Sequence, residues 1–288
     1  MELIVGKMAG FCAGVKNAVD KTVKELENSK RIFCLGELTH NSVVMNKLIS
    51  NGLKIIDEIE DGKEKVIIRA HGVKKDVYEK AKKMGIKLID LTCPRVLNIH
   101  KEAEKYANNG YYIFLIAEST HPETIGTYSF CGKNSFIIQN TEEVSKAVKE
   151  FEKSKLKNIL VISQTTFSIE KFNNIIDELE KNIDREKVNI AIDKTICDAT
   201  RLRQEEAIDI SKKVDLMIII GGKNSSNTKK LYEIANKNCN KAIWIETKDE
   251  LINEGLNKYE KIGITAGAST PKESIEEVID FLKNKLRH

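Results

Sequence analysis

The chain has 288 residues, of which 41% are apolar and 31% charged, so it is long enough to bury a core and to form about two domains of ordinary size. Its 47 basic and 43 acidic residues leave a net charge of only +4, which excludes the concentrated basic charge of a nucleic-acid-binding protein. Its six cysteines are too few for a disulfide scaffold, and no apolar run approaches the length of a membrane span. We therefore expect a globular cytoplasmic protein that works in a reducing compartment and binds neither nucleic acid nor membrane.

Short runs rich in Ile and Val alternate with amphipathic stretches along the whole chain. The runs are mostly apolar, which is typical of parallel strands buried on both faces. They predict strands at 3–5, 31–35, 65–68, 87–89, 111–116, 135–138, 158–162, 188–192, 216–220, 242–245 and 261–264. The stretches between them predict helices, among them 15–28, 73–84, 96–108, 169–181, 200–213 and 272–285. This alternation of strands and helices indicates a parallel α/β architecture.

Three places along the chain share one pattern, in which a strand is followed by a short loop, a cysteine and a helix. The cysteines at these places are Cys12, Cys93 and Cys197. The pattern predicts three similar units of roughly 95 residues each. We place them as domains at 13–92, 93–190 and 191–288, and the strand in segment 1–12 can pair with the third domain to close a ring of three.

The position of these three cysteines suggests that they bind a metal as thiolates. The helix N-terminus that follows each of them favours the thiolate over the thiol, and three convergent thiolates suit a soft metal centre. None belongs to a C-x-x-C pair, so the usual spacings of zinc ribbons and bacterial ferredoxins are absent. The alternative is that they are small packing residues, which is what we expect of Cys34, Cys131 and Cys239.

Three histidines, His40, His71 and His121, lie in loops after predicted strands, where parallel sheets bind ligands. A histidine there can donate to a phosphate or transfer protons near neutral pH. A zinc site built from the three histidines is an alternative, because imidazole is a common zinc ligand. Glu123 lies two residues after His121 and is a candidate proton donor, unless it only favours the dipole of its own helix.

Two further loops carry groups that could bind an anion. Ser225, Ser226 and Asn227 place hydroxyl and amide groups where a helix begins, with free backbone N–H groups. Ser269 occupies a similar position after the last predicted strand. Either loop alone could be an ordinary helix cap, but together with the histidines they indicate a phosphate or diphosphate pocket.

Taken in order, these pieces resemble one known family. The similarity begins at Gly10-Phe11-Cys12-Ala13-Gly14-Val15 and ends at Thr265-Ala266-Gly267-Ala268-Ser269, so it covers essentially the whole chain. The family is that of the 4-hydroxy-3-methylbut-2-enyl diphosphate reductases, which catalyse the last step of the non-mevalonate isoprenoid pathway. A piece such as Ala70-His71-Gly72-Val73 is weak alone, whereas eight pieces in order with three spaced cysteines are specific.

The resemblance implies three pseudo-symmetric α/β domains around a [4Fe-4S] cluster, with Cys12, Cys93 and Cys197 as its ligands. It implies that the open fourth iron binds the substrate hydroxyl and that Glu123 delivers protons beside Thr165, or beside Thr166 if the match slips by one residue. The implied binding residues for the diphosphate substrate are His40, His71, His121, Ser225, Ser226, Asn227 and Ser269. The implied reaction is reduction to isopentenyl and dimethylallyl diphosphate, with electrons from a flavodoxin- or ferredoxin-like carrier.

Two other functions remain open from the residues themselves. One is a zinc-dependent hydrolase of a phosphorylated metabolite that uses His40, His71, His121 and Glu123. The other is a non-catalytic module that binds a diphosphate or nucleotide, with the cysteines as packing residues. Cluster content separates the three hypotheses, because iron–sulfur thiolate ligation colours a protein brown.

Overall fold

A computed structural model describes residues 2–29, 31–62 and 64–285 of the chain. The chain forms two compact units. The first unit comprises Met1–Arg31, Glu37–Lys54 and Asp198–His288, and the second comprises Ile32–Gly36 and Ile55–Cys197. Our division into three domains at 13–92, 93–190 and 191–288 stays a prediction.

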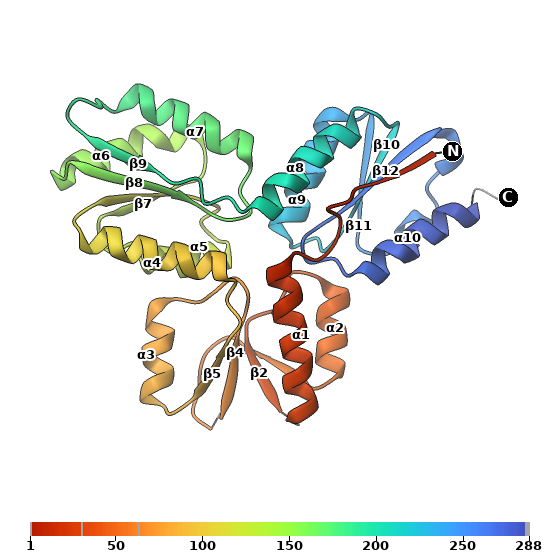
Figure 1. The fold of residues 1–288 in the computed structure, drawn as a ribbon, viewed down its shortest axis with the longest axis horizontal. Coiled ribbons are helices and arrows are strands. Elements are labelled where there is room, and N and C mark those ends of the chain that lie inside the picture. Colours follow the sequence, from red (N-terminus) through yellow and green to blue (C-terminus); the bar gives the residue numbers. More distant parts are fainter. Residues whose placement is uncertain (1, 30, 63, 286–288) are drawn as a thin grey trace. The chain divides into compact units, whose positions relative to one another are not determined.

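Two four-stranded sheets lie mainly in the second unit. Their strands are β2 (Ile32–Leu35), β3 (Leu53–Ile56), β4 (Lys65–Ile68), β5 (Lys87–Asp90), β6 (Tyr112–Ile116), β7 (Ser135–Ile138), β8 (Asn158–Ser163) and β9 (Asn189–Ile192). One sheet has the order β3-β2-β4-β5 and the other β7-β6-β8-β9 (Figure 1). In both sheets the last strand in the chain, β5 or β9, lies at an edge and pairs in parallel with β4 or β8.

The first unit contains the third four-stranded sheet. Its strands are β1 (Glu2–Val5), β10 (Leu216–Ile220), β11 (Lys241–Ile245) and β12 (Lys261–Ala266), in the order β1-β12-β10-β11. Strand β1 pairs in parallel with β12, from Glu2 opposite Lys261 to Val5 opposite Ile264. The N-terminal strand therefore completes a sheet whose other strands come from the C-terminal third of the chain, and it takes the edge position that β5 and β9 have in their sheets.

Helices connect the strands, and every strand pairing that the structure describes by register is parallel. The α-helices are α1 (Ala13–Asn28), α2 (Ser42–Ser50), α3 (Lys75–Lys83), α4 (Pro94–Asn108), α5 (Pro122–Tyr128), α6 (Val144–Ser154), α7 (Ile169–Asn182), α8 (Asp198–Ser211), α9 (Ser226–Asn238) and α10 (Lys272–Lys285). Short 3₁₀ segments occur at Thr141–Glu143, Lys248–Leu251 and Leu256–Lys258. The predicted parallel α/β architecture is confirmed, and β3 is a strand that the sequence analysis did not identify.

The packing around β6 shows why this strand is apolar without interruption. Phe114 packs with residues of α6 and α7 on one face, whereas Ile113 and Leu115 pack with Ile99 and Ala103 of α4 on the other. Figure 1 shows α6 and α7 over one face and α4 over the opposite face. Side chains alternate between faces along a strand, so a strand that is covered on both faces must be apolar at every position.

The first unit follows the same rule. Ile218 packs with Val278 of α10 on one face of its sheet, and Ile219 packs with Ala207 of α8 and Leu231 of α9 on the other.

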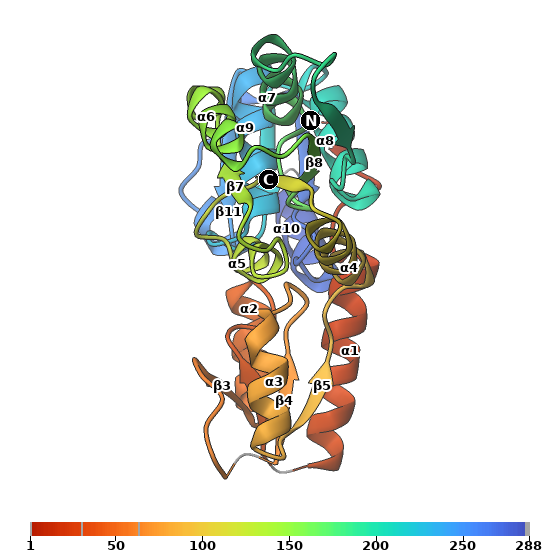
Figure 2. The same cartoon turned by 90° about the vertical axis from the view of Figure 1, so that its left-hand side faces the viewer.

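In the second unit, α3 runs alongside β4 and β5 (Figure 2). Where helices cover both faces of a parallel sheet, ligands bind at the carboxyl ends of its strands. Within the described residues, none of the helices has the length and apolar character needed to cross a membrane.

Candidate iron–sulfur and diphosphate site

The three candidate ligand cysteines lie at equivalent places in the three sheets. Each follows an edge strand (β1, β5 or β9) and directly precedes a helix (α1, α4 or α8). The backbone N–H of each donates to a carbonyl of the loop after the neighbouring strand: Cys12 to Ala268 at 3.0 Å, Cys93 to Ala70 at 3.0 Å and Cys197 to Thr165 at 3.2 Å. The shared pattern that the sequence suggested is therefore also a shared backbone geometry.

The chemistry of these three thiols fits a cluster. No cysteine among the described residues forms a disulfide, and Cys12, Cys93 and Cys197 are only partly buried. The N–H of Val15 donates to Cys12 Sγ at 3.4 Å, as expected where a helix N-terminus faces a thiolate. Soft thiolate donors of this kind suit iron–sulfur clusters.

The remaining cysteines have different surroundings. Burial raises the pKa of Cys34 to about 12, although nearby Arg69 lowers it, and burial raises the pKa of Cys131 to about 12. Cys239 packs beside Ala235 and donates from Sγ to the carbonyl of Val214 at 3.3 Å. These three side chains are packing residues, as expected.

Glu123 is a buried carboxyl group in the second unit. It lies in the first turn of α5 and is 3% exposed. The backbone N–H of Thr165 donates to its Oε1, and the Thr165 hydroxyl donates to its Oε2, both at 2.6 Å. Burial raises the pKa of Glu123 to about 7, while the two bonds from Thr165 lower it. A carboxyl group with this pKa can hold or release a proton at neutral pH.

The contact also distinguishes the two candidate threonines. Thr165 bonds Glu123 through both its backbone and its hydroxyl group, whereas the hydroxyl of Thr166 accepts from Nε2 of Gln164 at 2.8 Å. Gln164 is itself held in place, since its Oε1 accepts from the N–H of Glu118 at 3.0 Å. Thr165 is therefore the threonine beside the carboxyl group.

In the second unit, His121 lies next to Glu123, and His71 lies next to His121. The N–H of Glu123 donates to Nδ1 of His121 at 3.1 Å, so a neutral His121 carries its proton on Nε2. The rings of His71 and His121 meet edge to face, with centroids 5.5 Å apart. His71 follows β4 and His121 follows β6, so the carboxyl ends of the two sheets of this unit converge on one polar cluster.

In the first unit, His40 and Ser269 come together. The Ser269 hydroxyl donates to the carbonyl of His40 at 3.3 Å. Ser269 follows β12, and the adjacent Ala268 accepts the N–H of Cys12, so the loops carrying these three candidate residues meet. Ser42 and Lys223 are also linked, because Glu246 accepts the Ser42 hydroxyl at 2.8 Å and the Lys223 N–H at 2.7 Å.

Ser225, Ser226 and Asn227 form the start of α9. Ser225 is its N-cap and accepts the N–H of Thr228 at 3.3 Å. Asn227 is only 3% exposed, and neither polar atom of its amide group has a hydrogen-bond partner among the residues that the structure describes. Such a buried amide group is costly unless a ligand satisfies it, and a helix N-terminus favours an anionic ligand. This arrangement fits the diphosphate-binding role that we predicted for the loop.

Gly222, which precedes the loop of Ser225, Ser226 and Asn227, lies against the backbone of the His40 loop. A Cβ atom at Gly222 would lie 2.2 Å from the His40 carbonyl oxygen. This oxygen belongs to the backbone, so the clash cannot be relieved by rotating a side chain.

We expect Gly222→Ala to lower the free energy of unfolding by about 1–3 kcal/mol, because the two loops must separate. Chemical denaturation measures this change. Gly255→Ala is the matched control in the same unit, since its Cβ would meet no atom within 4 Å, and an equal loss in both variants would contradict the prediction.

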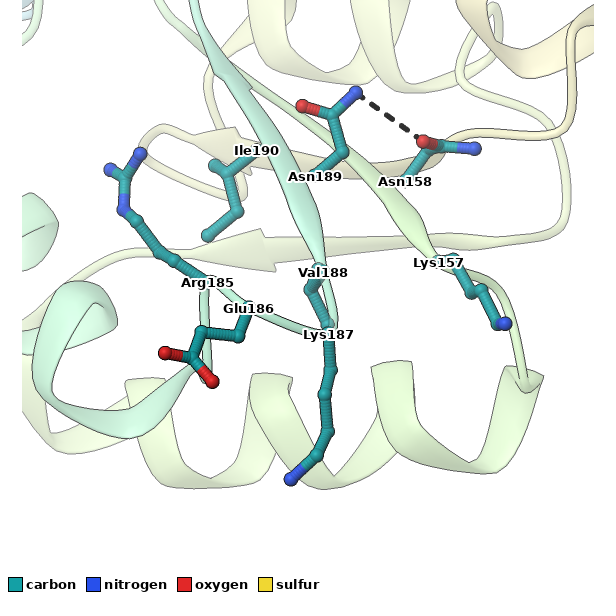
Figure 3. Close-up of a pocket in the computed structure, with 8 residues that line it drawn as sticks. All are labelled: Lys157, Asn158, Arg185, Glu186, Lys187, Val188, Asn189 and Ile190. Atoms are coloured by element: carbon teal, nitrogen blue, oxygen red, sulfur yellow. Dashed lines mark hydrogen bonds between the residues drawn. The ribbon is translucent and has the colours of Figure 1, made fainter.

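A pocket elsewhere in the second unit does not belong to this site. Figure 3 shows it at the amino ends of β8 and β9, whereas Thr165 and Cys197 follow the carboxyl ends of the same strands. Its lining residues are Lys157, Asn158, Arg185, Glu186, Lys187, Val188, Asn189 and Ile190. Arg185 pairs with Glu180 and Lys187 pairs with Asp184, so the basic charge of the pocket lining is largely neutralised.

Two charged residues whose roles were not predicted from the sequence contact the candidate site. Arg203 and Glu206 of α8 bond the backbone of the loop before Cys12. The only local signal is a polar helix face, which ordinarily indicates exposure to solvent. The burial of Arg203 and the partners of both side chains, almost 200 residues away in the sequence, distinguish them.

Comparisons with known proteins agree with the geometry. The family model described as LytB protein matches residues 3–283. The chain is 42% identical to "4-hydroxy-3-methylbut-2-enyl diphosphate reductase" of Alkaliphilus oremlandii over 288 residues, covering 99% of this chain and 100% of that protein. It is also 42% identical to the protein of the same name from Clostridioides difficile over 287 residues, with the same coverage.

Solved structures give the same result. The E-1-hydroxy-2-methyl-but-2-enyl-4-diphosphate reductase from Plasmodium falciparum is similar with a TM-score of 0.90 and 30% identity, over 98% of this chain and 88% of that one. A structure of (E)-4-hydroxy-3-methyl-but-2-enyl diphosphate reductase is similar with a TM-score of 0.69 and 35% identity, over 99% and 100% of the two chains. The resemblance found in the sequence is confirmed, and the chain belongs to the LytB protein family.

Proposed function

We propose that this chain reduces 4-hydroxy-3-methylbut-2-enyl diphosphate to isopentenyl and dimethylallyl diphosphate, as the final step of the non-mevalonate isoprenoid pathway. The observation that carries the proposal is Glu123, a buried carboxyl group with a pKa of about 7, in the unit that also provides Cys93 and Cys197. A reductive dehydration needs such a group. Two electrons and two protons enter, the carbon–oxygen bond of the substrate alcohol breaks, and the oxygen leaves as water.

Cys12, Cys93 and Cys197 would hold a [4Fe-4S] cluster through their thiolates. Bound there, the cluster would supply an open iron for the substrate hydroxyl and a route for single electrons from a flavodoxin- or ferredoxin-like carrier. A reducing compartment, which we take to be the cytoplasm, would keep these thiols available.

Glu123 and Thr165 would handle the proton at defined atoms. The N–H of Thr165 occupies Oε1 of Glu123 and can only donate, so an added proton belongs on Oε2. The Thr165 hydroxyl lies 2.6 Å from Oε2 and can either donate or accept, so it fits both protonation states of the carboxyl group. The pair can therefore store a proton and pass it on without rearranging the backbone.

The diphosphate would be bound by aimed donors. His40, Ser225, Ser226, Asn227 and Ser269 of the first unit and His71 and His121 of the second are the residues that we assign to this role. Neutral hydroxyl, amide and imidazole groups can bind the oxygens while leaving a path for protons. The buried amide group of Asn227, unpartnered among the described residues, supports this assignment most directly.

The proposal is tested by purifying the full chain without oxygen and assaying it with a one-electron reductant. We expect a brown protein with about four irons per chain that converts the substrate alcohol to the two products. A colourless protein with stoichiometric zinc that hydrolyses the phosphate ester would favour the zinc hydrolase instead. Diphosphate binding with neither metal nor turnover would favour a non-catalytic binding module.

A further inference from the structure

The loop between β1 and Cys12 contains neither a helix nor a strand, and side chains of helix α8 bond both of its halves. β1 ends at Val5 and α1 begins at Ala13, with Cys12 as the N-cap. Within the loop, the N–H of Gly6 donates to the Ile264 carbonyl at 2.8 Å, and the N–H of Cys12 donates to Ala268 at 3.0 Å. The segment between these two bonds depends on side chains from α8 for much of its hydrogen bonding.

Glu206 holds the first half of the loop. Its Oε1 accepts the N–H of Lys7 at 2.7 Å, and its Oε2 accepts the N–H of Met8 at 3.0 Å. A Cβ atom at Gly6 would lie 2.6 Å from Glu206 Oε2, so the glycine leaves room for the carboxylate. Two bonds from consecutive N–H groups to one carboxylate are charge-assisted and fix the direction of the chain.

Arg203 holds the second half of the loop. It is 2% exposed, and its guanidinium group donates to the carbonyls of Gly10 and Ala199, each at 2.7 Å. Gly10 is two residues before Cys12. Arg203 and Glu206 are three residues apart on α8, so they lie on the same face of the helix and contact the loop together.

Helix α8 begins at Asp198, directly after Cys197. The helix that starts at one candidate ligand therefore also holds the loop that carries another. We propose that Arg203 and Glu206 are positioning residues that set the backbone of Cys12 for cluster ligation. This assignment rests on the proposed function, because it takes Cys12 as a ligand. Supporting residues around metal ligands typically contribute 10–100-fold to metal affinity or activity.

The test uses substitutions that keep the approximate size of each side chain but remove part of its hydrogen bonding. Arg203→Lys can donate from only one nitrogen position, and Glu206→Gln keeps only one acceptor for the two N–H groups. The controls are Arg201→Lys and Glu205→Gln, which alter an exposed ion pair on the same helix with 2.9 Å between its charged groups. Each full-length variant is loaded with iron and sulfide without oxygen.

Two measurements are made on the loaded proteins: the rate of iron loss to a chelator and the electron paramagnetic resonance spectrum of the reduced cluster. We expect iron loss to be about 10–100 times faster in the Arg203 and Glu206 variants, with an altered spectrum, and unchanged in the controls. A role in stability alone would lower the melting temperature of the metal-free protein but would leave the spectrum unaltered.

The outcomes separate this assignment from the proposed function. A wild-type chain that takes up iron, together with variants whose spectrum and iron loss match it, overturns the positioning role alone. A wild-type chain that takes up no iron overturns the proposed function, and the positioning role with it. Faster iron loss and an altered spectrum in both variants, with unchanged controls, support the assignment.

Discussion

Cys93→Ser is expected to lose the cluster and to lower turnover by more than about 100-fold. Losing a residue that only supports a metal ligand already lowers activity by up to about 100-fold, and losing a ligand should lower it further. The thiolate is the species that binds iron, and a serine hydroxyl does not ionise near neutral pH. The fold should survive, because Cys93 is the N-cap of α4 and serine is a preferred N-cap residue. Iron content, visible absorbance and far-ultraviolet circular dichroism of the anaerobically purified variant measure these effects separately.

Cys239→Ser is the matched control for this prediction. Cys239 is a C-cap rather than an N-cap, and its Sγ donates to the Val214 carbonyl, a bond that a serine hydroxyl can replace. We expect this variant to keep its iron and its turnover. If both variants lose iron alike, or neither does, the assignment of the ligands is wrong.

The fold was predictable because its main signal is local. Strands buried on both faces must be apolar throughout, and this is visible in runs such as 216–220, which the structure describes as β10. β3 escaped this rule because its second residue, Lys54, is exposed and interrupts the apolar run. Pairing of β1 with β12 could only be suggested, since it joins residues more than 250 positions apart and depends on how the whole chain closes.

The candidate site was predictable to a different degree for each kind of residue. Cysteines and histidines in loops after strands carry their chemistry in their identity, so Cys12, Cys93 and His121 could be named from the sequence. The choice between Thr165 and Thr166 could not be made there, because it depends on which hydroxyl faces Glu123. The contacts of Arg203 and Glu206 with the Cys12 loop could not be predicted, since charged residues on a helix ordinarily face solvent.

Glu123→Gln is expected to keep the cluster and substrate binding but to lower turnover by about 10²–10⁴-fold, the usual contribution of a positioned proton donor. The substitution is nearly isosteric. The glutamine carbonyl can accept the N–H of Thr165, and its amide nitrogen can donate to the Thr165 hydroxyl, so both contacts of the carboxyl group are preserved. Only the exchangeable proton is lost. Single-turnover kinetics with the reduced, iron-loaded variant separates this loss from any change in binding.

The same variant has a predictable pH dependence. The proton donor must be protonated, so wild-type kcat/KM should fall as pH rises through about 7, the pKa of Glu123, and the residual rate of Glu123→Gln should lack this fall. Unchanged turnover in the variant would remove Glu123 from the proton path.

Stability gives an independent check that needs neither cluster nor substrate. Burial raises the pKa of Glu123 from its ordinary value of 4.5 to about 7, so between these two values the folded chain holds a proton that the unfolded chain has released. As far as this carboxyl group is concerned, the free energy of unfolding is therefore highest below about pH 4.5. It falls progressively as pH rises to about 7 and stays at the lower value above that. Glu123→Gln should flatten this part of the dependence of the unfolding free energy on pH, measured by chemical denaturation of the metal-free protein. Identical pH profiles for the wild type and the variant would show that Glu123 is ionised at neutral pH, and a group that is already ionised has no proton to deliver.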